Sequence, residues 1–281
     1  MGAGSPAAQP ATLVLIHGLF SSPAEFGLLS RILRARGIAF EFLEIPGYTN
    51  ADRTRPSSWR QWVDAADAAL DARFATGTSI AIGGLCVGGM IAAALAIRPR
   101  PQTVVGLALM SPTFEYDGWS IGRWQRWRKL AYLLRIDRWM TVREQAPFGI
   151  KNLKTREWVM QELAGAGASA AGPAKLPLRG IREAERLCAW VRKNFAAIRV
   201  PLLVLHARED EIASLASVDR VLATATATAT TRRVVLEHSF HMITIDNDRQ
   251  RVAHELADFA TASARFRSPD RLDVTQCRVA S

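Results

Sequence analysis

The stretch Ser79-Ile-Ala-Ile-Gly-Gly-Leu-Cys-Val-Gly-Gly-Met-Ile-Ala-Ala-Ala94 decides the fold of this 281-residue chain. Its first five residues form an apolar run typical of a buried strand, and the Ala-rich run after Gly89 favours a helix. Between them, Gly84-Leu-Cys-Val-Gly88 fits the pattern of a sharp strand-to-helix turn that carries a nucleophile, with sulfur in place of oxygen. Glycines flank the cysteine because strand and helix pack closely at such a turn.

Cys86 is therefore the candidate nucleophile. The turn would place its sulfur at a helix N-terminus, where the dipole and free N–H groups favour a thiolate. The alternative is an inert buried cysteine in a glycine-rich turn, because cysteine is often buried without reacting. The choice between these readings depends on the rest of the chain.

Three further segments support the catalytic reading. Leu13-Val-Leu-Ile-His-Gly-Leu-Phe20 is typical of a buried strand that enters a His-Gly turn. Pro201 to Ala207 is a strand that ends in the acidic run Arg208-Glu-Asp-Glu211, and the strand from Arg232 leads to a loop with His241. The order nucleophile, acid, base along the chain is that of one large class of hydrolases.

These motifs resemble the α/β-hydrolase superfamily, and within it the small bacterial carboxylesterases and monoacylglycerol-lipase-like hydrolases. The resemblance covers roughly residues 11 to 263 and rests on four motifs: His17-Gly18-Leu19, Gly84–Gly88, Ala207–Glu211 and Ser239–Asp246. Most members carry serine where this chain has Cys86, although dienelactone hydrolases and polyhydroxyalkanoate synthases, on related folds, carry cysteine.

The resemblance implies a triad of Cys86, His241 and Asp210. His241 would act as general base and Asp210 would orient it. His238 is the rival base, and Glu209 and Glu211 are neighbours of the acid. The resemblance also implies an oxyanion hole built from the backbone N–H groups of Leu19 and Val87.

The predicted fold class is α/β: a mostly parallel central sheet with helices on both faces and an inserted helical cap. Continuous apolar runs that alternate with helical segments predict such a sheet. We expect the core to comprise residues 11–112 and 186–263, the cap residues 113–185, and loose tails residues 1–10 and 264–281. The cap shows no clear strand. Ser22-Pro-Ala-Glu25 predicts a capping box at the start of the first helix.

An aromatic stripe in the cap is a candidate substrate-binding surface. Trp119, Trp124, Trp127 and Tyr132 could line an acyl pocket, or they could pack as the core of the cap. The sequence leaves both readings open.

Charge is concentrated in the cap. Residues 113–199 contain 17 basic and 8 acidic residues, whereas the rest of the chain contains 19 and 18. Clustered positive charge favours an anionic partner, such as an acidic acyl carrier protein or CoA. The alternative is a solvated, Arg-rich surface without a partner.

Several classes of protein are disfavoured. The chain shows no dinucleotide or phosphate-binding loop, no nucleic-acid module and no metal-ligand spacing, so we expect no cofactor and no metal. Three widely spaced cysteines indicate no disulfide framework and suit a reducing cytoplasm. Ser79 to Ile97 lacks charge, but its four glycines argue against a transmembrane helix.

The predicted function is acyl-ester or acyl-thioester hydrolysis through a covalent acyl-enzyme, of carboxylesterase or thioesterase type. A cysteine nucleophile makes a thioester intermediate, which also suits an acyltransferase that moves an acyl group from CoA or a carrier protein to an amine or alcohol. A ligand-binding pseudoenzyme is the third reading, and the intact acid and base positions count against it.

Overall fold

The structure is a computed structural model, and it describes residues 10–50, 57–75, 77–98, 103–122 and 125–266. Trp124 and most of the two predicted tails lie outside these ranges. The strands are β1 (Thr12–Ile16), β2 (Phe40–Phe42), β3 (Ser79–Leu85), β4 (Thr103–Met110), β5 (Thr141–Arg143), β6 (Ala168–Ser169), β7 (Gly172–Pro173), β8 (Lys175–Pro177), β9 (Leu202–Ala207) and β10 (Thr231–Leu236). The α-helices are α1 (Gly27–Ala35), α2 (Trp59–Arg73), α3 (Val87–Ile97), α4 (Gln125–Leu133), α5 (Leu153–Ala166), α6 (Leu178–Asn194), α7 (Leu215–Leu222) and α8 (Arg249–Ser263). Short 3-10 helices are η1 (Pro23–Phe26), η2 (Ile136–Trp139) and η3 (Phe195–Ala197).

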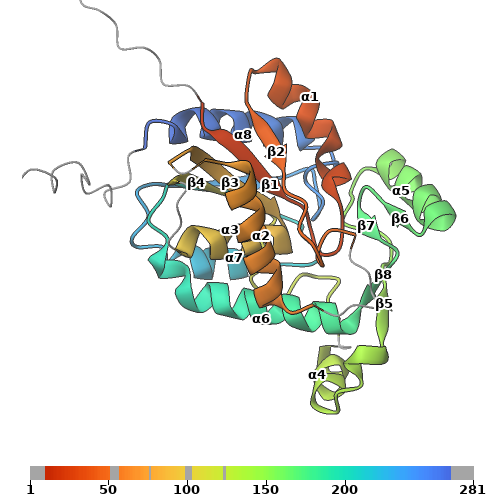
Figure 1. The fold of residues 1–281 in the computed structure, drawn as a ribbon. Coiled ribbons are helices and arrows are strands. Elements are labelled where there is room, and N and C mark those ends of the chain that lie inside the picture. Colours follow the sequence, from red (N-terminus) through yellow and green to blue (C-terminus); the bar gives the residue numbers. More distant parts are fainter. Residues whose placement is uncertain (1–9, 51–56, 76, 99–102, 123–124, 267–281) are drawn as a thin grey trace, which may run out of the picture.

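A six-stranded sheet forms the centre of the molecule, with the order β10-β9-β4-β3-β1-β2. Every pairing in it is parallel. Helices α1 and α8 pack together on one face, while α2, α3 and α6 cover the other (Figure 1). Each face therefore has its own apolar cluster, which is why the strands are buried on both sides. The predicted parallel sheet with helices on both faces is confirmed.

The stretch that decides the fold lies at the middle of this sheet. β3 pairs with β1 on one side and β4 on the other, and α3 packs directly on it. Strand and helix together bury most of this uncharged run, from Ile80 to Leu95, inside the domain, with Cys86 partly exposed. Within the described ranges, no helix combines the length and the apolar character that a membrane crossing requires.

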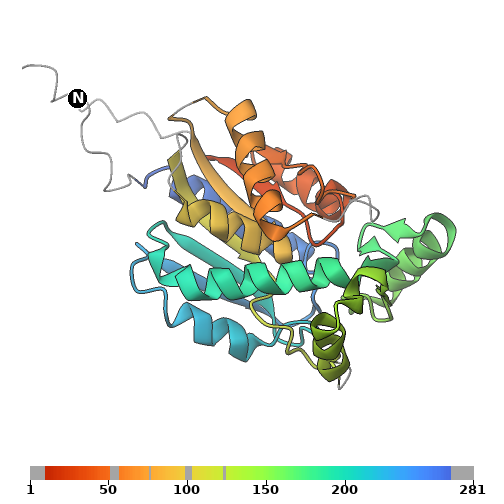
Figure 2. The same cartoon turned by 60° about the horizontal axis from the view of Figure 1, so that its bottom comes forward.

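The segment expected to form the cap contains α4, η2, α5 and the short strands, which extend beyond the sheet at one end of the molecule (Figures 1 and 2). The prediction of a cap without strands is wrong, because β5 pairs antiparallel with β8, and β6 with β7. These strands have two or three residues each, too few for an alternating pattern to show in the sequence. The helix α6 runs unbroken across the predicted cap–core boundary at residue 185, contacting η2 and the core helix α3.

Candidate active site

The turn between β3 and α3 holds Cys86 in an unusual backbone conformation. Its φ is 56° and its ψ is −122°, outside the regions that side chains normally prefer. Its N–H donates to the carbonyl of Met110 on the neighbouring strand at 2.9 Å. A Cβ on Gly84 would lie 2.3 Å from the carbonyl carbon of Gly88, and one on Gly88 would lie 2.2 Å from the carbonyl oxygen of His17. Both positions therefore require glycine.

His241 and Asp210 form a buried pair beside this turn. His241 Nδ1 lies 2.8 Å from Asp210 Oδ2 and 3.0 Å from Oδ1. The carboxylate is itself fixed, because Oδ1 accepts from the N–H groups of Ile212 and Ala213 at 2.8 and 2.9 Å. Asp210 follows β9 and His241 follows β10, so two parallel strands bring them to the same edge of the sheet.

Electrostatics favour the ion pair over its neutral form. Burial alone would lower the pKa of His241, but Asp210 and Cys86 together raise it well above its usual value. Burial alone would raise the pKa of Asp210, but the charge and hydrogen bonds of His241 lower it. An imidazolium held in this way can stabilise a thiolate at its other nitrogen.

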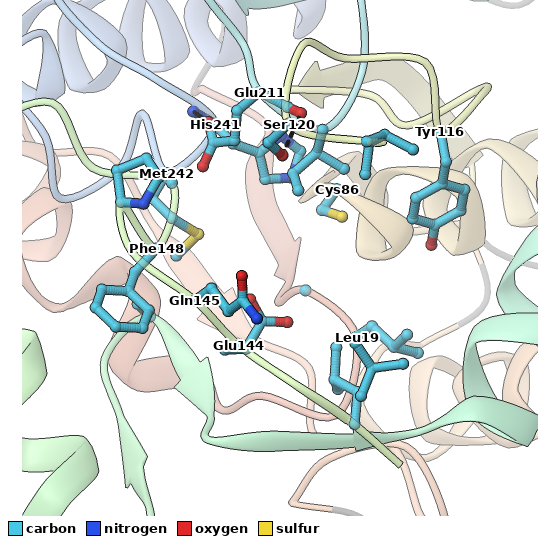
Figure 3. A pocket seen from close by; sticks show the side chains of 18 of the residues that line it. Leu19, Cys86, Tyr116, Ser120, Glu144, Gln145, Phe148, Glu211, His241 and Met242 are labelled. Carbon is cyan, nitrogen blue, oxygen red and sulfur yellow. Dashed lines mark hydrogen bonds between the residues drawn. The ribbon is translucent and has the colours of Figure 1, made fainter. Parts of the chain in front are cut away.

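The backbone of His241 is anchored on both sides. Its N–H donates to Glu211 Oε2 at 3.1 Å, and its carbonyl accepts from Ser111 Oγ at 2.7 Å. Within the described part of the chain, its buried Nε2 has no hydrogen-bond partner. His241 borders the same cavity as Cys86 (Figure 3).

The sulfur of Cys86 contacts a residue that the sequence did not single out. Sγ lies 3.2 Å from Oγ1 of Thr113, a fully buried hydroxyl just beyond β4. The same hydroxyl lies 3.4 Å from the carbonyl of Ser111. It can accept from a thiol, or turn and donate to a thiolate. Thr113 follows β4, the strand that pairs with β3, and this position in the sequence was the signal that could have identified it.

The cavity has a volume of about 570 Å³ and is bounded by both core and cap. Cys86 and His241 lie on its core side, and residues from Val142 to Gly149 form much of its cap side. Three carboxyl groups also line it: Glu25, Glu144 and Glu211. Burial raises the pKa of Glu25 and of Glu144 to about 7, and it also raises that of Glu211.

The predicted capping box at Ser22 is only half formed. Ser22 Oγ accepts from the N–H of Ala24 at 3.3 Å, but the side chain of Glu25 turns inward. Glu25 Oε2 instead accepts from the N–H of Gly18 at 2.7 Å. This long-range contact fixes the loop that carries Leu19, and the local sequence pattern could not indicate it.

The residues proposed for the oxyanion hole lie at the same end of the sheet. Leu19 lines the cavity. Val87 is the first residue of α3, so its N–H has no acceptor within the helix. Both positions remain compatible with the predicted role, which depends on their backbone N–H groups.

The other histidines lie away from Cys86 or are committed elsewhere. His17 is buried, burial lowers its pKa to about 4, and its ring nitrogens contact Gly18 O and Thr49 Oγ1. His238, the rival base, is exposed, and its backbone is bonded to Asp248. His241 is therefore the one of this pair that reaches the cavity.

The two described tryptophans of the candidate aromatic stripe, Trp119 and Trp127, lie on the surface, and Trp124 lies outside the described residues. Trp119 is 61% exposed and its Nε1 donates to the carbonyl of Glu209, while Trp127 is 72% exposed. Neither borders the cavity. The helix α4 turns Arg128 inward, whereas Trp127 beside it faces outward. Tyr132 instead packs partly buried against Leu178 and Ile181 of α6. Among the described residues, no group of His, Cys, Asp or Glu side chains is arranged to hold a metal ion.

A family model described as serine aminopeptidase, S33, matches residues 7–248. The chain belongs to this family. Its name refers to serine, whereas Cys86 occupies the turn in this member. A search of curated proteins found no match.

Several solved structures share the fold at low sequence identity. The monoacylglycerol lipase of Paleococcus ferrophilus is 16% identical, with a TM-score of 0.72 over 90% of this chain and 94% of that chain. A soluble variant of monoglyceride lipase from Saccharomyces cerevisiae is 15% identical, with a TM-score of 0.72 over 92% and 88%. An esterase from Thermogutta terrifontis is 16% identical, with a TM-score of 0.61 over 92% of each chain. These likenesses and the family match confirm the α/β-hydrolase fold.

Proposed function

We propose that this S33-family protein hydrolyses esters or thioesters through an acyl-enzyme on Cys86. The observation that carries the proposal is the His241–Asp210 contact of 2.8 Å beside the strained Cys86 turn, both at one cavity. Similar folds in a monoacylglycerol lipase and an esterase support ester substrates. Cysteine in place of serine supports thioesters as well, because exchange between two thioesters changes little in bond energy.

Transfer of the Cys86 proton to Nε2 of His241 creates the thiolate–imidazolium pair from which acylation starts. The sulfur then attacks the substrate carbonyl, and the C–S bond forms as the carbonyl oxygen takes the negative charge. When the tetrahedral intermediate collapses, the bond to the alcohol or thiol leaving group breaks. That group takes the proton from Nε2.

Deacylation uses the same groups in reverse. His241 takes a proton from a water molecule, whose oxygen attacks the thioester carbonyl. The C–S bond breaks, the proton passes to sulfur, and the carboxylic acid leaves. Asp210 keeps Nδ1 of His241 protonated throughout, so that Nε2 faces the reaction.

Two sets of donors stabilise charge in these steps. The N–H groups of Leu19 and Val87 would bind the oxyanion, and Glu25 positions the first of them through Gly18. The hydroxyl of Thr113, 3.2 Å from Sγ, would donate to the thiolate before attack.

The outer surface of the cap supports an anionic acyl donor, such as CoA or an acidic acyl carrier protein. Between Trp127 and Arg143 the exposed charged side chains are all basic: Lys129, Arg135, Arg138 and Arg143. The acidic residue in that range, Asp137, is buried and paired with Arg182. A donor with phosphates or acidic residues would therefore meet complementary charge at the cap.

The proposal is tested by intact-mass analysis after incubation with phenyl hexanoate and hexanoyl-CoA. We expect a hexanoyl adduct that maps to Cys86 and is absent from Cys86→Ala. His241→Ala and Asp210→Asn should each reduce turnover by about 10³-fold or more. His238→Ala, which removes an exposed histidine three positions away, is the matched control and should retain activity. An adduct on Cys188, or equal losses in the two histidine variants, would contradict the proposal.

A further inference from the structure

The wall of the cavity is acidic, although the outer surface of the cap is basic. Glu25, Glu144 and Glu211 all border the space that contains Cys86 and His241. They come from three separate parts of the chain: η1, the loop after β5, and the loop after β9. Their electrostatic influence on one another or on His241 shows that they lie close together.

Two of these carboxyl groups have partners in the protein. Glu25 Oε2 accepts from the N–H of Gly18 at 2.7 Å, and Glu211 Oε2 accepts from the N–H of His241 at 3.1 Å. Both contacts hold loops that carry catalytic groups. Their presence in the wall is therefore explained by the architecture of the site.

Glu144 is different. Its backbone N–H donates to Ala174, but among the described residues its carboxylate meets neither a hydrogen-bond donor nor a paired cation. Protein surrounds it closely enough to raise its pKa, yet part of its surface stays accessible from the cavity. Figure 3 shows Glu144 and Gln145 on the opposite side of the open space from His241 and Cys86.

The two arginines at the cavity do not neutralise Glu144. Arg128 is buried and paired with Glu185. Arg143 is exposed, and His241 is the positively charged group that lowers the pKa of Glu144. His241 and Cys86 border the same space, which marks it as the place where a substrate is bound.

We propose that Glu144, with Glu211 on the other side of the cavity, binds a positively charged group of the substrate, such as an amine, guanidinium or quaternary ammonium. This inference rests on the proposed function, because it names the substrate class of the same site. A cation placed between the two carboxylates relieves their mutual repulsion and supplies the partner that Glu144 lacks. The neutral part of the substrate then lies toward Cys86.

The charge of Glu144 makes this preference dependent on pH. Burial, and then the charge of Glu211, raise its pKa to about 7, although His241 opposes the shift. A quaternary ammonium group does not titrate, so preference for it should grow between pH 6 and pH 8 as Glu144 ionises. Below pH 6 the protonated acid would discriminate little between a cationic substrate and a neutral one.

The test compares esters that differ in charge but hardly in shape. Choline hexanoate is paired with 3,3-dimethylbutyl hexanoate, and the phenyl ester of 5-(trimethylammonio)pentanoate with that of 6,6-dimethylheptanoate. At pH 8 we expect kcat/KM to favour the cation in at least one pair by about 10- to 100-fold, the range for one charge-assisted contact. Glu144→Gln should reduce that ratio by about tenfold or more, while Glu144→Asp should keep most of it. Glu157→Gln, an exposed change on α5, should leave the ratio as in the unmodified protein.

Equal rates within both pairs, or a preference that survives in Glu144→Gln, would overturn the inference while leaving the proposed hydrolase intact. Failure to hydrolyse any of the four esters would count against the proposed function instead. In that case calorimetric titration of Cys86→Ala with the choline ester and its neutral isostere decides the inference. Tighter binding of the choline ester, lost when Glu144→Gln is added, supports it, and equal binding refutes it.

Discussion

Replacing Glu25 with Gln should make the protein more stable at neutral and alkaline pH. Glu25 is 2% exposed, and its Oε2 accepts from the N–H of Gly18. The amide oxygen of Gln can accept the same hydrogen bond but carries no charge. The substitution therefore keeps the contact that fixes the Leu19 loop and removes the burial of a carboxylate.

The size of the effect follows from the shift in the pKa of the Glu25 carboxyl group. Burial raises the pKa of Glu25 from 4.5 to about 7, opposed by its hydrogen bond with Gly18 and by the charge of His241. The folded state thus holds this proton more tightly than the unfolded state. Stability contributed by the protonated group is fully present below pH 4.5 and is lost as the pH rises toward 7. At about 1.4 kcal/mol per pKa unit, the loss amounts to about 3 kcal/mol.

Urea unfolding of both proteins at pH 4.5, 6, 7 and 8 measures this difference. The free energy of unfolding of Glu25→Gln, relative to the unmodified protein, should increase by about 3 kcal/mol from the lowest pH to the highest. Subtracting the free energy of unfolding of the unmodified protein at each pH cancels the contributions of the other titrating groups, which both proteins share. Glu157→Gln on the exposed face of α5 controls for the loss of one negative charge. A difference that stays constant with pH would refute the argument that Glu25 is a buried acid with a raised pKa.

Three further results are expected. Thr113→Val should slow acylation by roughly 10- to 100-fold with little change in fold, because Sγ loses a hydroxyl 3.2 Å away, and stopped-flow acylation rates check this. Iodoacetamide should label Cys86 about tenfold or more faster than Cys188 near neutral pH, because burial and the neighbouring Cys86 raise the pKa of the Cys188 thiol; peptide mapping that finds Cys188 first would contradict this. The KM for hexanoyl-CoA should increase with salt between about 0.02 and 0.5 M, whereas that for phenyl hexanoate should not, since salt screens the basic cap; reversing Arg135 and Arg138 to Glu should remove the salt effect.

Local patterns were sufficient to locate the parts of the site that belong to the core. The glycines around Cys86 reflect contacts that exclude any Cβ at positions 84 and 88, so the turn is visible in the sequence. Asp210 and His241 follow apolar runs that form adjacent parallel strands. The carboxyl ends of such strands meet at one edge, so chain order indicated which loops would come together. The choice of Asp210 and His241 within those loops came from the resemblance to α/β-hydrolases.

The tertiary structure decided the roles of residues whose neighbours are distant in sequence. Glu25 matched a local capping pattern, yet it bonds to Gly18, seven residues earlier, because the folded chain places that N–H within reach. Thr113 and Glu144 are ordinary residues in the sequence and become notable only where their segments border the cavity. The exposure of Trp127 likewise depends on which face of α4 packs against the rest of the protein. Periodicity and motif spacing describe the interactions of a residue with its own segment, whereas the wall of a cavity is built from segments that only the packed fold brings together.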